Sequence, residues 1–86
     1  MPEISRFYGI VITMYYKDHP PPHFHARYGG QRTKFSISDL RLTEGRLERR
    51  AISLVLEWAF QHRDELMENW ELARQNKPLK RIAPLT

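Results

Sequence analysis

Residues 22–38 read PHFHARYGGQRTKFSIS, and this stretch decides the fold. Apolar and polar side chains alternate on both sides of Gly29-Gly30. Alternation with a period of two is typical of a β-strand that buries one face. Two adjacent glycines are a common turn in a two-residue β-hairpin. We therefore predict a hairpin whose strands cover residues 22–28 and 31–38.

A two-residue turn fixes which residues face each other in the hairpin. Phe24 should then pair with Phe35 on the core face. The opposite face gathers two histidines and three cations, with no carboxylate from either strand: His23, His25, Arg27, Arg32 and Lys34. Such a row of like charges destabilises a sheet but suits the binding of phosphate groups. The alternative is a solvated face of splayed side chains, because salt screens exposed charges.

The remaining elements follow from the same periodicity rules. Residues 8–16 are rich in β-branched and aromatic side chains and predict a central strand, and a short strand is expected over residues 40–43. A helix should run from about Leu47 to His62, and a second helical stretch should cover residues 64–75. The pattern leaves open whether these stretches form one kinked helix or two.

Together these elements predict one small α+β domain over residues 1–86. We expect an antiparallel sheet of three or four strands, with one or two helices packed on one face. Residues 1–45 would form the β-rich half and residues 46–76 the helical half. Residues 77–86 would form a tail or an edge strand.

The charge of the chain is uneven. Residues 1–50 contain nine Lys or Arg and five Asp or Glu, whereas residues 51–86 contain five of each, so the net charge of +4 lies in the first part. This asymmetry favours an anionic partner such as nucleic acid. The absence of cysteine excludes disulfides and Cys-ligated zinc and fits a reducing compartment. With no signal-peptide pattern and no apolar run long enough to span a bilayer, we expect a cytoplasmic protein without membrane contact.

A cluster of ionisable residues precedes and enters the hairpin. Asp18, His19, His23 and His25 lie within eight positions, around three consecutive prolines. His23 and His25 share one face of a strand, and the stiff proline segment could bring His19 and Asp18 back towards them. These four residues are the candidate reaction centre.

Three interpretations of the cluster compete. No cofactor is favoured, but the three histidines and Asp18 would suit a divalent metal such as zinc. In a metal-independent site, His23 and His25 would act as base and acid on RNA, which supplies its own 2′-hydroxyl nucleophile. Arg27, Arg32 and Lys34 would then hold the phosphate. The third interpretation is structural, with the histidines hydrogen-bonding to the loop backbone.

Several blocks of the chain resemble a bacterial family, the domain-of-unknown-function family DUF4160. They are MPEISRF at residues 1–7, GIVI at 9–12, MYYKDH at 14–19, PPHFH at 21–25, NWELAR at 69–74 and KPL at 77–79. The resemblance covers essentially the whole chain and includes Asp18, His19, His23, Phe24 and His25 in the family's motif. It assigns no catalytic role to any of them. Pro20 departs from the family pattern and suggests a stiffer loop.

The resemblance implies a small bacterial or phage-borne cytoplasmic protein. Similar proteins are often encoded beside a second small domain, which suggests a toxin–antitoxin module. Combined with the basic hairpin face, this favours a toxin-like component that binds or cleaves RNA and has a small antitoxin-like partner. One alternative is a non-catalytic regulatory module that binds nucleic acid or protein, and the other is a His-ligated metal-binding protein. Whether the chain is an enzyme stays open, and an unpaired edge strand leaves room for a homodimer.

Overall fold

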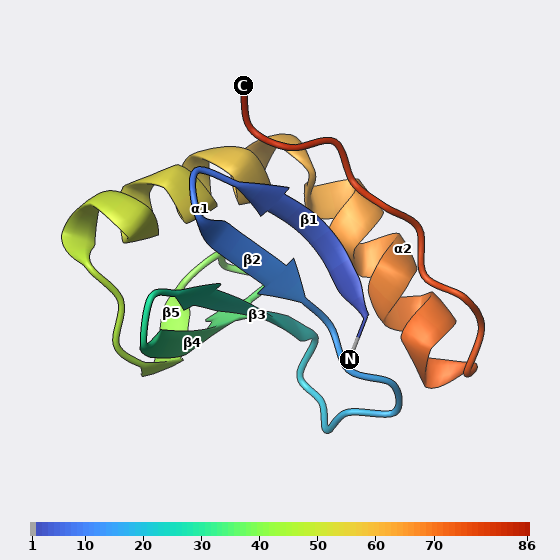
Figure 1. Cartoon of the computed structure of the whole chain (residues 1–86). Coiled ribbons are helices and arrows are strands. Elements are labelled where there is room, and N and C mark those ends of the chain that lie inside the picture. The colour runs from blue at the N-terminus through green and yellow to red at the C-terminus, as the bar shows by residue number, and fades with distance from the viewer. Residues whose placement is uncertain (1) are drawn as a thin grey trace.

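The computed structural model describes residues 2–86 and contains one five-stranded antiparallel sheet and two helices (Figure 1). The strands follow one another in the sheet in chain order. Their bounds are β1 Glu3–Phe7, β2 Ile10–Thr13, β3 His23–Tyr28, β4 Gln31–Ser36 and β5 Leu42–Gly45. The helices are α1 Arg49–Gln61 and α2 Arg63–Arg74. The α+β class is confirmed, but the sheet has more strands than the three or four that we expected.

The central hairpin has the predicted register. Phe24 lies opposite Phe35 in β3 and β4, and their rings stack with centroids 5.4 Å apart. Gly29 has a φ of 59°, which a glycine adopts without strain and which the turn requires. His25 therefore faces Lys34, and Arg27 faces Arg32. The pattern of residues 22–38 was sufficient to set the face on which each of these side chains lies.

The single strand predicted over residues 8–16 was too long, because the first two of these residues form a turn. Tyr8 and Gly9 connect β1 to β2, and both have positive φ values, of 49° and 80°. A type I′ turn requires this conformation at both central residues, and asparagine or glycine usually signals it. Because a tyrosine occupies the first position, the turn resembled strand sequence and β1 was overlooked. The β5 strand was likewise expected slightly too early, over residues 40–43.

The two helical stretches are separate helices. The chain breaks at His62, which has a φ of −124° and a ψ of 26° and caps both helices. In α1, Trp58 is fully buried and contacts Phe7 and Phe24, so this helix covers the apolar face of the sheet. In α2, Leu66 and Trp70 are buried. Figure 1 shows the two helices following one another around one side of the sheet.

Residues 77–86 do not form an edge strand; they run as an irregular tail past β1 and α2 (Figure 1). The Ile82 amide donates a hydrogen bond to the Ile4 carbonyl oxygen at 2.8 Å. The Asn69 side chain binds both backbone groups of Lys80 at 2.9 Å. Because Ile82 and Leu85 are buried, the tail is part of the core. No helix within residues 2–86 is long and apolar enough to cross a membrane.

Candidate functional site

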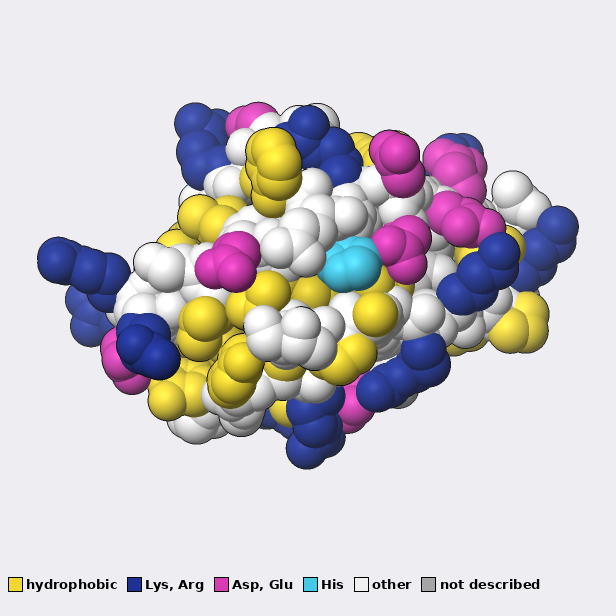
Figure 2. All heavy atoms as spheres, turned by 90° about the horizontal axis from the view of Figure 1, so that it is seen from above, with side chains coloured by type: hydrophobic (Ala, Val, Ile, Leu, Met, Phe, Trp, Pro, Cys, Tyr) yellow, Lys and Arg dark blue, Asp and Glu magenta, His cyan; other side chains and the backbone are white. Residues whose placement is uncertain are grey.

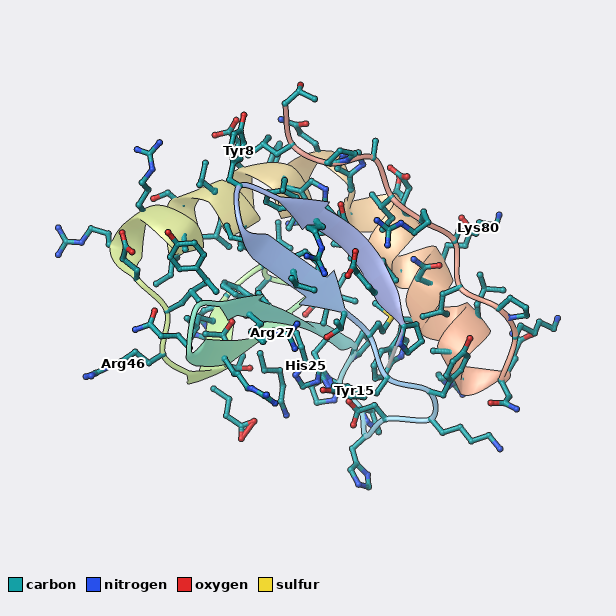
Figure 3. All side chains as sticks on the ribbon, viewed as in Figure 1. Tyr8, Tyr15, His25, Arg27, Arg46 and Lys80 are labelled. Carbon is teal, nitrogen blue, oxygen red and sulfur yellow. The ribbon has the colours of Figure 1, made fainter. Side chains whose placement is uncertain are left out.

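The outer face of the sheet carries the hydrophilic side chains that the hairpin register predicted. His25 and Arg27 project from β3, beside Lys34 and Arg32 of β4. Thr13 and Val11 of β2 lie opposite His25 and Arg27, so the row is in the middle of the sheet rather than at an edge. Figure 3 shows Arg27, His25 and Tyr15 close together in this region. The site is thus built on strands, which hold side chains more firmly than loops do.

His23 is the most restrained member of the cluster. Its side chain is only 4% exposed, and its ring packs 5.1 Å from the Trp70 ring of α2. Its Nδ1 lies 2.8 Å from the Pro21 carbonyl oxygen, and its Nε2 lies 2.8 Å from Oδ2 of Asp18. Both ring nitrogens are therefore engaged by oxygen atoms. These contacts hold the ring in one orientation, and the role of His23 in an acid–base pair stays a prediction.

Asp18 joins the two strand histidines from the loop before β3. Its Oδ2 is 2.8 Å from Nε2 of His23 and 3.4 Å from Nε2 of His25, and its Oδ1 accepts the His19 backbone N–H at 2.8 Å. Partial burial raises the pKa of Asp18, but the His19 amide and the two imidazoles outweigh it, so the pKa is lowered. Asp18 is consequently ionised at neutral pH.

His25 lies at the accessible end of the cluster. Its side chain is 27% exposed, and the Tyr15 ring meets it edge-on with centroids 4.6 Å apart. Burial lowers the pKa of His25; its hydrogen bond to the Asp18 carboxylate opposes this shift, and the nearby positive charge of Lys34 adds to it. The net direction is downwards, so the imidazole is neutral at neutral pH. A neutral imidazole is a good metal ligand or proton acceptor.

His19 does not join the other histidines. Its side chain is exposed, and only its backbone N–H contacts the cluster, through Asp18. It does line a groove of about 300 Å³ beside His23, together with Pro21, Lys34 and Glu44. Of the four residues proposed as a reaction centre, three converge and His19 stays at the rim.

The hairpin itself contributes no carboxylate to this face, as we expected, but neighbouring elements do. Asp18 approaches the histidines, and Glu44 of β5 lies opposite Lys34 and pairs with its ammonium group at 3.1 Å. Within residues 2–86, neither Arg27 nor Arg32 forms an ion pair. The region of unpaired positive charge is therefore smaller than the sequence indicated, because Lys34 is paired and only Arg27 and Arg32 remain.

Three potential metal ligands meet at the cluster. One ligand atom each from Asp18, His23 and His25 lies within 4.8 Å of the others. Two imidazoles and a carboxylate form a donor set used for zinc and for non-haem iron. The fourth histidine, His62, is elsewhere and pairs with Glu65 between the helices. Trp70 and Glu44 were not recognised from the sequence as neighbours of the cluster, and a register shift between Lys34 and Phe35 in the pairing of β4 with β5 hid Glu44.

The family described as Domain of unknown function (DUF4160) matches residues 9–71. The chain belongs to the DUF4160 family. The matched region includes Asp18, the histidine motif, the whole central hairpin, all of α1 and most of α2, and excludes β1 and the tail. Neither a curated protein nor a solved structure matches the chain. For this DUF4160 protein, functional inference therefore depends on the site itself.

Proposed function

We propose that this protein binds the phosphate backbone of RNA on the outer face of the β3–β4 hairpin. The observation that carries the proposal is the pairing of Arg27 with Arg32 on adjacent strands, without an acidic partner for either within residues 2–86. Like charges placed directly opposite each other destabilise a sheet. A bound phosphate would remove this repulsion, and guanidinium groups suit phosphate because they donate two parallel hydrogen bonds.

The surroundings of the two arginines support a polyanion. Lys34 adds a third cation beside His25, although Glu44 partly neutralises it. A shallow groove of about 200 Å³ runs between His25, Arg32, Lys34 and Glu44. On the face that Figure 2 shows, towards α1 and the C-terminus, acidic and basic side chains are interspersed. A phosphate bound to Arg32 would lie beside the exposed edge of His25.

The family resemblance suggests a biological role for such RNA binding. The protein would be a bacterial, cytoplasmic, toxin-like component of a two-gene module, with a small antitoxin-like protein as its partner. We choose RNA among polyanions because it supplies its own 2′-hydroxyl nucleophile, which the toxin-like interpretation of the histidine motif uses. Expression in a bacterial host, with and without the neighbouring gene, tests this part: growth inhibition relieved by the neighbour supports it, and unaffected growth contradicts it.

Binding itself is tested with a fluorescently labelled single-stranded RNA. The double variant Arg27→Ala/Arg32→Ala should bind at least about tenfold more weakly than the native protein at low salt. The matched control is Arg49→Ala/Arg50→Ala, which removes the same charge from the exposed start of α1. An equal loss of RNA affinity in both variants would show that binding depends only on the net charge of the protein. That result would contradict a site on the hairpin.

A further inference from the structure

We infer that Asp18, His23 and His25 form a binding site for one divalent transition-metal ion, with zinc the best match. This inference goes beyond RNA binding and does not depend on it. It starts from the hydrogen bonds of His23. The Pro21 carbonyl oxygen is only an acceptor, so the contact at 2.8 Å requires a proton on Nδ1. When the His23 imidazole is neutral, this is its one N–H, and Nε2 then presents a lone pair to Asp18.

A lone pair facing a carboxylate oxygen is unfavourable unless a cation lies between them. His25 directs its own Nε2 at the same Asp18 oxygen, at 3.4 Å. One carboxylate oxygen and two imidazole nitrogens thus converge where the side chain of His23 is almost completely buried. Protons on the imidazoles can bridge these atoms only in pairs, whereas one metal ion would bind all three at once.

The distances fit a small ion after a minor adjustment. Zinc binds nitrogen and oxygen at about 2.0–2.2 Å, so two ligands of a tetrahedral site lie about 3.3 Å apart. The separation between Asp18 and His25 is 3.4 Å, and that between Asp18 and His23 is 2.8 Å. Of these two separations, the second must open by about 0.5 Å, and the two imidazole nitrogens lie within 4.8 Å of each other. Asp18 belongs to a loop rather than a strand, so it is the member that can move.

The groups around the three ligands orient them as in known metal sites. Metal-binding histidines commonly donate their other N–H to a backbone carbonyl, as His23 does to Pro21. The His19 amide occupies Oδ1 of Asp18 and leaves Oδ2 for the ion. Lys34 would repel a cation, but its ammonium group is paired with Glu44. With three protein ligands, at least one coordination position remains for water or another ligand.

The test uses the full-length protein without a histidine tag, stripped with a chelator and shown to be folded by circular dichroism. Zinc titration by calorimetry should give one ion per chain, and cobalt should give the visible absorption of a low-symmetry site. His25→Ala removes the most exposed ligand and should weaken zinc binding by at least about 100-fold. His19→Ala removes a histidine from the same loop without touching the cluster, and should leave binding unchanged.

A second measurement uses the native protein, so its result does not depend on whether a variant folds. In the native protein, zinc should shift the Nε2 resonances of His23 and His25 in long-range ¹H–¹⁵N spectra and leave those of His62 unchanged. If the folded native chain binds neither zinc nor cobalt stoichiometrically, or if His19→Ala weakens binding as much as His25→Ala, the inference is overturned. Loss of RNA binding by the arginine variants with zinc binding intact would separate this site from the proposed function.

Discussion

The Pro21 carbonyl oxygen lies 2.8 Å from Nδ1 of His23 and turns the other ring nitrogen towards Asp18. The local chain thereby sets the orientation of a buried imidazole before any ligand arrives. Three consecutive prolines restrict the backbone that supplies this oxygen. The cluster is therefore preorganised at one end of the basic hairpin face, and this relationship makes several outcomes predictable.

Replacing His23 with alanine should destabilise the fold. The change empties space beside Trp70 and removes the partner of the partly buried Asp18 carboxylate. We expect a loss of about 2–4 kcal/mol in the free energy of unfolding, measured by urea denaturation. The control His19→Ala should stay within about 0.5 kcal/mol because that side chain is exposed. Equal effects in the two variants would mean that His23 is not restrained as described.

Gly45 should tolerate no side chain. Its φ is 87°, and a Cβ atom there would lie 2.2 Å from the Arg32 carbonyl oxygen. Gly45→Ala should therefore cost more than about 1 kcal/mol of stability and disturb the pairing of β5 with β4. Gly30→Ala is the matched control, because a Cβ at Gly30 meets nothing within 4 Å. Thermal melts of both variants check the difference, and a stable Gly45→Ala would contradict this close approach.

The tail should influence the titration of Glu3. Hydrogen bonds from Arg6 and Arg81 lower the pKa of Glu3 from 4.5 to about 2. Because the folded-state pKa is depressed, this contribution to stability is present above about pH 4.5 and is lost as the pH falls through about 2. Carboxyl-detected NMR should find the low midpoint in the native protein. Arg81→Ala should raise it, whereas Arg74→Ala, in α2, should not; a native midpoint near 4.5 would refute the ion pair.

Much of the fold could be predicted because local chemistry and tertiary structure agree. Gly29-Gly30 between two alternating strands specified the register, and with it the shared face of His25, Arg27 and Lys34. The turn at Tyr8 and Gly9 was missed because its positive φ values occur at a tyrosine, which local propensity does not favour there. Local signals predict a turn only when its residues are the usual ones.

The site was only partly predictable because its completion depends on contacts between elements. His23 and His25 share a face by strand alternation alone, so their proximity followed from the sequence. The approach of Asp18 to both, and the exclusion of His19, depend on the path of a proline-containing loop, which no periodicity describes. Glu44 of β5 neutralises Lys34 of the neighbouring strand β4. The few residues of β5 did not determine where this strand starts or how it pairs with β4.

The most direct test of the proposed function is the salt dependence of RNA binding. Each phosphate contact with a single strand contributes about 0.7 to the slope of log affinity against log salt concentration. If Arg27 and Arg32 each hold a phosphate, Arg27→Ala/Arg32→Ala should reduce the magnitude of this slope by about 1.4, and Arg49→Ala/Arg50→Ala should leave it unchanged. A slope that is the same in the native protein and the hairpin variant would contradict the account.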